Sequence, residues 1–152
     1  MSNYDRYSKF IVRSVDHIFK NFFRDEKVTE VYESQSTVKD PKVMVEINGT
    51  LSGELIINFP VKTLNHLTRQ VMSSSSPRNL KKHHEEVAGE IANMITGTFA
   101  NLLQYMKHNV SLAAPEFNED PITIKTFYEN INLSFDTSFG GFDIDLYYKE
   151  ND

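Results

Sequence analysis

Residues 86–97, in the middle of the chain, read Glu86-Val87-Ala88-Gly89-Glu90-Ile91-Ala92-Asn93-Met94-Ile95-Thr96-Gly97. Apolar side chains here and just beyond recur at helical spacing, which predicts one buried helix face. That face comprises Val87, Ile91, Met94, Ile95, Thr98 through its methyl group, Leu102 and Met106. Glu86, Glu90, Asn93 and Gly97 form a second stripe of the same helix, pointing away from the apolar one. The helix is therefore predicted to present carboxylates, an amide and a glycine.

The helix that contains residues 86–97 is predicted to run without interruption from about residue 78 to residue 107. At 1.5 Å per residue its length is about 45 Å, which is long for a globular protein. Ser76 is a suitable N-cap with Pro77 at the first helical position, and Asn109 can end the helix.

Two further helices are predicted from apolar periodicity. The first covers about residues 4–23, and its aromatic-rich stripe is expected to pack in the core. The stripe consists of Tyr4, Tyr7, Phe10, Ile11, Val15, Ile18, Phe19, Phe22 and Phe23. A short helix opens at Pro60 and is expected to bury Val61, Leu64, Leu67 and Val71. Residues 73–77, four serines and a proline, are expected to form a loop.

Alternating apolar residues predict two β-hairpins. The first joins strands around residues 43–47 and 55–59 with a turn near Ser52-Gly53. The second joins strands around 131–135 and 142–146 with a turn at Gly140-Gly141. Shorter strands are expected within 28–35 and 110–114, and residues 116–120 are expected to form a polar loop. Because the first hairpin is apolar on one face, the sheet is expected to be covered on that side only.

The chain of 152 residues fits a single domain over residues 1–152. Its hydrophobic content of 39% supports a packed core rather than disorder. Long helices combined with hairpins predict an α+β fold, with a mostly antiparallel sheet and long helices packed on one face.

Composition also narrows the classes of function. A net charge of −5 argues against a general nucleic-acid binder, which needs a basic surface. The absence of cysteine excludes disulfides and thiolate metal sites. No apolar stretch approaches the ~18 residues of a membrane span, and no signal-peptide core follows the N-terminus. We therefore expect a cytoplasmic, soluble protein with neither nucleic acid nor membrane as partner.

The run from Glu90 to Gly97 resembles the Glu-x-x-Asn signature helix of the CheC/CheX/FliY phosphatases of bacterial chemotaxis. The order of elements over almost the whole chain is similar to that of the CheX branch, which has one such motif where the CheC branch typically has two. Pro115 matches a proline that the family carries some twenty residues after the asparagine. Glu86 is a departure, because the family often has Asp or Ser at that position.

The resemblance implies an enzyme that hydrolyses the aspartyl phosphate of a CheY-type response regulator. It implies two catalytic residues: Asn93, which positions the attacking water, and Glu90, which pairs with the active-site lysine of the receiver domain. Glu86 and Gly97 lie on the same stripe and are expected to help dock the partner, since a glycine permits close approach of another backbone. The resemblance also implies a homodimer. It implies no metal or cofactor bound by this chain, because Mg²⁺ belongs to the receiver.

Three other interpretations of these residues remain. A module of the same fold could bind a phosphorylated receiver, or form part of a flagellar switch, without catalysis. His83 and Glu86 are three residues apart and could begin a metal site, although such sites need three or four ligands. Glu90 and Asn93 could also be ordinary solvated residues on the outer face of a core helix. Glu86 could likewise be an ordinary solvated carboxylate, favoured by the helix dipole in the N-terminal part of the helix.

Overall fold

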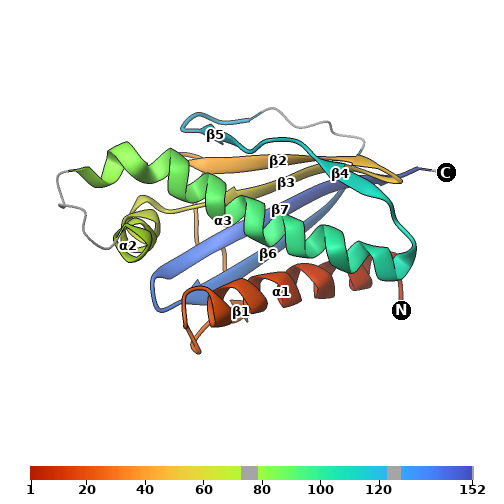
Figure 1. Ribbon diagram of the computed structural model, residues 1–152, viewed down its shortest axis with the longest axis horizontal. Helices are drawn as coiled ribbons and strands as arrows, with labels where there is room; N and C mark the ends of the chain where they lie inside the picture. The colour runs from red at the N-terminus through yellow and green to blue at the C-terminus, as the bar shows by residue number, and fades with distance from the viewer. Residues whose placement is uncertain (73–78, 123–127, 152) are drawn as a thin grey trace.

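The computed structural model describes residues 1–72, 79–122 and 128–151. Within these residues, α-helices pack on a single antiparallel sheet (Figure 1), as predicted for an α+β fold. The elements follow in the order α1 (Asn3–Asn21), β1 (Thr29–Val31), β2 (Lys42–Gly49), β3 (Leu51–Asn58), α2 (Val61–Val71), α3 (Leu80–Leu103), the 3₁₀ turn η2 (Gln104–Met106), β4 (Val110–Leu112), β5 (Glu116–Asn118), β6 (Glu129–Thr137) and β7 (Gly140–Glu150).

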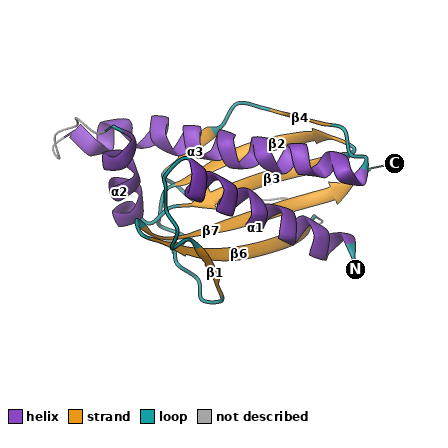
Figure 2. Cartoon of the chain, turned by 60° about the horizontal axis from the view of Figure 1, so that its bottom comes forward, coloured by secondary structure: helices purple, strands orange, loops and turns teal. Residues whose placement is uncertain are grey.

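The sheet has the strand order β1-β6-β7-β3-β2-β4, and β5 pairs with the other half of β2. All of these pairs are antiparallel. Helices α1 and α3 lie side by side across one face of the sheet, and α2 sits at one end of it (Figure 2). The long helices therefore cover one face, and α3 runs over the β2 side of the sheet.

The core lies between these two helices and the sheet. From α1 it takes Tyr7, Ile11, Val15 and Phe19, which are fully buried. Phe19 stacks on Phe142 of β7 with ring centroids 5.4 Å apart. Two residues of the predicted aromatic stripe are not buried as expected: Tyr4 is 44% exposed and Phe22 is 50% exposed. In α2, Val61 is likewise exposed, and buried Thr63 and Thr68 accompany Leu64 and Leu67 instead.

Helix α3 is continuous from Glu86 to Gly97, as predicted, but it ends earlier than expected. The α-helix stops at Leu103 and tightens into the 3₁₀ turn η2. Lys107, with φ of 62°, then takes the left-handed conformation that turns the chain towards β4. The predicted start at Ser76 and Pro77 lies outside the described residues.

Both hairpin turns differ from the predicted positions. The first turn is at Gly49-Thr50, and Gly53 lies within β3, opposite Ile47. A Cβ atom on Gly53 would overlap the carbonyl oxygen of Tyr147, so close approach of β7 requires that glycine. The second turn is at residues 138–139, and Gly140, with φ of 118°, begins β7.

Residues 116–118, predicted as part of a polar loop, form strand β5 on the outer edge of β2. Phe117 pairs with Val43 and packs half-buried against the core. The strand at residues 28–35 is shorter than predicted and covers only Thr29–Val31. The alternation rule missed β5 because only one of its three side chains is apolar.

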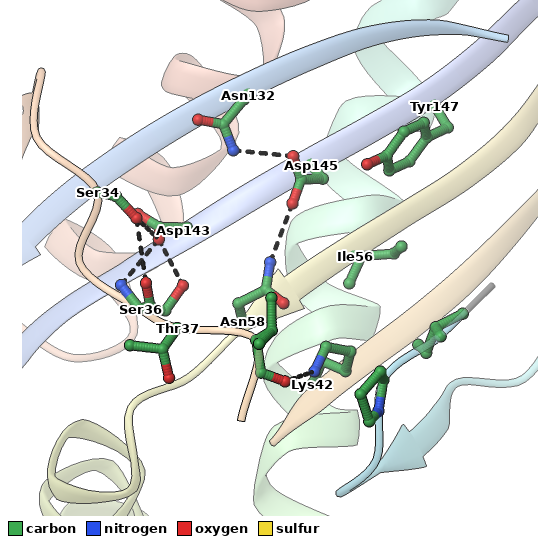
Figure 3. A pocket seen from close by; sticks show the side chains of 13 residues that line it. Ser34, Ser36, Thr37, Lys42, Ile56, Asn58, Asn132, Asp143, Asp145 and Tyr147 are labelled. Atoms are coloured by element: carbon green, nitrogen blue, oxygen red, sulfur yellow. Dashed lines mark hydrogen bonds between the residues drawn. The ribbon is translucent and has the colours of Figure 1, made fainter. Parts of the chain in front are cut away.

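The sheet is also covered on its second face in part, against prediction. Asp143, which is only 3% exposed, accepts hydrogen bonds from the hydroxyls of Ser34 and Ser36 and from the backbone N–H of Gln35 and Ser36. These bonds hold residues 34–36 against the sheet beside a cavity of about 370 Å³ (Figure 3). The polar groups of this cavity are paired with one another: Asp145 accepts from Asn58 and Asn132, and the Lys42 ammonium donates to backbone carbonyls.

Candidate functional site

The predicted site residues form one exposed stripe on α3. Glu86, Glu90 and Asn93 are exposed, and Gly97 is half-buried one turn further on. The helix holds them there because the residues between them anchor its other side: Val87, Ala88, Ile91, Ala92 and Ile95 are all buried against the sheet or the neighbouring helices. The 3.6-residue period therefore points the stripe away from the sheet.

The side chains of Glu90 and Asn93 make no polar contact within the described part of the chain. No carboxylate or amide atom of either residue has a hydrogen-bond or ion-pair partner among the described residues. The Glu86 carboxylate has only a long contact, with its Oε2 3.9 Å from Nδ1 of His83, and its side chain is 76% exposed. A carboxyl group and an amide thus lie one turn apart, with their hydrogen-bonding capacity available to a partner.

A shallow pocket of about 240 Å³ lies beside this stripe, between α3 and the β4–β5 segment. Its helix side is formed by Glu85, Glu86, Gly89, Glu90 and Asn93, and its strand side by Val43, Pro115 and Phe117. Sequence reasoning missed Glu85, Gly89 and Phe117. The available signal was Gly89, a second glycine within the helical pattern, which marks a close approach of another segment.

The surroundings of Gly97 differ from those of Gly89. A Cβ atom added to Gly97 would meet no described heavy atom within 4 Å, apart from its chain neighbours and the backbone of its own helix turn. Packing within the described chain therefore does not require a glycine at this position. The glycine leaves a gap in the side-chain cover of α3, on the same stripe as Asn93.

His84 fixes the N-terminal part of the site helix. Its Nε2 lies 2.7 Å from Oδ1 of Asn65 on α2, so this nitrogen carries the proton and donates. Burial lowers the pKa of His84; the nearby charge of Glu119 opposes this shift and that of Lys81 adds to it. The neutral imidazole ties α3 to α2 just before Glu86.

The structure adds no third metal ligand to His83 and Glu86 among the described residues. In the residues that the structure describes, no group of three or more His, Cys, Asp and Glu side chains is placed to hold a metal ion. The described helices also include none with the length and apolar character needed to span a membrane.

Comparison with known proteins points to one family. The family model described as "Chemotaxis phosphatase CheX" matches residues 42–126, which include α3 and the pocket. No curated protein sequence matches the chain.

Solved structures share the fold at low sequence identity. The chemotaxis protein CheX from Vibrio vulnificus has a TM-score of 0.81 at 17% identity, over 98% of this chain and 100% of that one. CheX from Desulfovibrio desulfuricans has a TM-score of 0.77 at 16% identity, over 95% and 99%. A CheX–CheY–BeF₃–Mg²⁺ complex from Borrelia burgdorferi has a TM-score of 0.78 at 15% identity, over 95% and 98%.

Proposed function

This chain belongs to the CheX family of chemotaxis phosphatases, and we propose that it removes the phosphoryl group from the aspartyl phosphate of a CheY-type response regulator in the cytoplasm. The observation that carries the proposal is the exposed pair Glu90 and Asn93 on α3. Both side chains face outwards without a partner among the described residues, while the rest of the helix is anchored in the core. A rigid helix of this kind can enter the active site of another protein.

The reaction needs little covalent chemistry from this chain. Water attacks phosphorus, the bond between phosphorus and the aspartyl oxygen breaks, and the products are an aspartate carboxylate and inorganic phosphate. Such transfers depend mainly on positioning and on stabilising charge. The Asn93 amide can accept a hydrogen bond from the water through its oxygen and donate one to the phosphoryl group through its nitrogen. A neutral amide does not take the proton of the water, which passes to the phosphoryl oxygens or to solvent.

Glu90 would set the position of that amide. Its carboxylate lies one turn before Asn93 on the same stripe and would pair with the active-site lysine of the receiver. Such a charge-assisted pair docks the helix at a fixed depth and so fixes the reach of Asn93. Glu86 would extend this docking surface by one turn, and the gap at Gly97 would admit the receiver backbone. Pro115 and Phe117 would supply an apolar rim.

The Borrelia burgdorferi complex supports the choice of partner, since a CheX of the same fold is there joined to CheY with BeF₃ and Mg²⁺. By analogy, we place Mg²⁺ in the receiver and no metal or cofactor in this chain. We also propose a homodimer. Strand β1 covers only residues 134–136 of β6, so no other described strand pairs with the outer edge of residues 129–133. Pairing between two copies would close such an edge, and a monomer by light scattering at tens of micromolar would refute it.

The direct test is the lifetime of phosphorylated receivers, labelled with acetyl phosphate, with and without this protein. We expect faster phosphate release from at least one CheY-type receiver. The variant Asn93→Ala should lose roughly 10²- to 10³-fold in rate at saturation, the usual cost of one preorganised polar contact. Asn101→Ala is the matched control, because it removes another exposed amide from α3. Clear binding with an unchanged phosphate lifetime would instead support a non-catalytic binding module.

A further inference from the structure

Helix α1 carries a stripe of exposed basic residues. Arg6, Lys9, Arg13, His17 and Lys20 are spaced three or four residues apart, and all are exposed. The opposite side of the helix is the buried one, with Tyr7, Ile11, Val15 and Ile18. The basic stripe therefore points straight away from the sheet. We call it the α1 basic stripe.

The α1 basic stripe is not neutralised within the described part of the chain. No carboxylate among the described residues lies within ion-pair distance of Arg6, Lys9, Arg13 or Lys20. Asp16 and Glu30 border the same surface as Lys9 and Arg13 but stay beyond that distance. With four Lys and Arg side chains against the bordering Asp16 and Glu30, this surface carries a net positive charge on a chain whose net charge is −5.

The α1 basic stripe and the Glu90–Asn93 stripe project from the same face of the molecule. Helices α1 and α3 pack side by side on one face of the sheet (Figure 2), and each stripe lies opposite the buried side of its helix. Packed helices have axes about 8–10 Å apart. At one end, Arg6, Lys9 and Arg13 share a small cavity with Tyr105 and Met106, which follow α3 directly.

A folded partner docked on α3 would also overlie α1. A standard protein interface covers about 800 Å² on each side, which corresponds to a patch about 30 Å across. This width is about three times the usual separation of two packed helices. A receiver centred on Glu90 and Asn93 would therefore have part of its surface above the α1 basic stripe.

A phosphorylated receiver would carry negative charge, which is complementary to the positive charge of the α1 basic stripe. We take the surroundings of such a site to be acidic, because Mg²⁺ is held there by carboxylates and phosphoryl oxygens. On this chain, the pocket beside Asn93 is lined by three carboxylates, Glu85, Glu86 and Glu90, and by no basic residue of the described chain. Those carboxylates, together with the net charge, would repel an acidic rim at long range. The α1 basic stripe is a nearby surface that would attract it, in addition to the exposed Lys81 and Lys82 at the start of α3.

We propose that the α1 basic stripe is a second docking element, which steers the acidic rim of the phosphorylated receiver onto α3. This inference rests on the proposed function, and it assigns to α1 a role in association but none in the chemical step. Electrostatic steering raises the association rate constant and fades as salt screens the charges. The dephosphorylation rate of the bound complex should therefore not depend on the stripe.

The test compares two double variants with the same net charge. Lys9→Gln/Arg13→Gln removes two charges from the stripe, and Lys39→Gln/Lys149→Gln removes two exposed charges elsewhere. Association with a Mg²⁺-bound, beryllofluoride-loaded receiver is followed by stopped flow from about 20 mM to about 500 mM salt. We expect the stripe variant to associate roughly 3- to 10-fold more slowly at low salt and the control less than 2-fold. The two should converge at high salt, with unchanged phosphate release at saturation.

The outcomes separate this inference from the proposed function. Equal slowing of both double variants, or no slowing of the stripe variant, would overturn the docking role of α1 while leaving the phosphatase activity intact. Binding without hydrolysis would overturn the proposed activity, and the stripe would still be judged by the association rates. A wild-type protein that neither binds nor dephosphorylates any receiver of the host would overturn both.

Discussion

Gly89 of α3 faces Pro115, and a Cβ atom on this glycine would lie 3.5 Å from Cγ of the proline. This separation is an ordinary van der Waals contact, so the helix and the segment between β4 and β5 approach each other closely at the floor of the site pocket. Gly97, two turns later, faces open space. The two glycines of α3 therefore have different surroundings, and the same substitution should have different consequences at each.

Gly97→Ala should stabilise the free protein and weaken its binding to the receiver. Alanine gains up to about 1 kcal/mol over glycine in a helix interior, and nothing in the described chain obstructs the added methyl group. Gly89→Ala is the matched control, because Gly89 is buried beneath Pro115 and a partner should not reach it. Urea unfolding and receiver titration measure both effects. Unchanged affinity for Gly97→Ala would show that the receiver does not approach this gap.

Asp143→Asn should destabilise the fold by about 2 kcal/mol, the scale of lost hydrogen bonds to a buried charge. Burial by itself would raise the pKa of Asp143, but hydrogen bonds from Ser134, Ser36, the backbone of Gln35 and Ser34 outweigh it and hold the pKa below its usual value. The stability that this carboxylate contributes is therefore present above the unfolded pKa of about 3.9 and is lost as the pH falls through the lower folded pKa.

The control for Asp143 is Asp136→Asn, an exposed carboxylate on the neighbouring strand β6. Chemical denaturation at pH 7 and between about pH 5 and 2 separates the two variants. Asp143→Asn should lose stability at neutral pH and show a flatter acid profile than the wild type. Identical profiles for both variants would mean that the bonds from residues 34–36 to this carboxylate do not stabilise the fold.

The sequence predicted the parts of the fold that depend on local periodicity. The outward direction of Glu90 and Asn93 follows from the apolar residues between them, and α1 and both hairpins follow from similar patterns. Features that depend on contacts between distant segments could not be predicted from the sequence. Gly53 looked like a turn residue, whereas β7 requires it within a strand. Phe117 looked like part of a polar loop because its pairing with Val43 joins residues far apart in the chain. The hydrogen-bond partners of Asp143 could not be predicted either, because Ser34, Gln35 and Ser36 lie more than 100 residues away in the chain.

The link between His84 and Asn65 predicts a stability loss in mild acid. Burial lowers the pKa of His84 in the folded state, whereas the unfolded value is about 6.5. As the pH falls below about 6.5, the unfolded chain takes up a proton that the folded chain does not, so the free energy of unfolding decreases. His84→Gln removes the titration and keeps an N–H donor for Asn65. Its stability should depend less on pH between about 6.5 and 5 than that of the wild type, measured by chemical denaturation at each pH; an unchanged slope would contradict the prediction.

The last prediction separates Glu90 from Glu86, which carry the same charge one turn apart. A pair between Glu90 and the receiver lysine would be covered by the docked receiver, and hydrogen bonds to charged groups contribute about 1.5–3 kcal/mol. Glu90→Gln should therefore weaken binding about 10- to 100-fold, mainly through faster dissociation. The Glu86 side chain is 76% exposed, and exposed ion pairs contribute only about 0.2–1 kcal/mol. Glu86→Gln should lose no more than about 5-fold, and high salt should abolish that loss but not the loss for Glu90→Gln. Surface plasmon resonance on a beryllofluoride-loaded receiver measures both constants. Equal losses for the two variants would refute a specific lysine contact at Glu90, because a general field effect would not distinguish residues one turn apart.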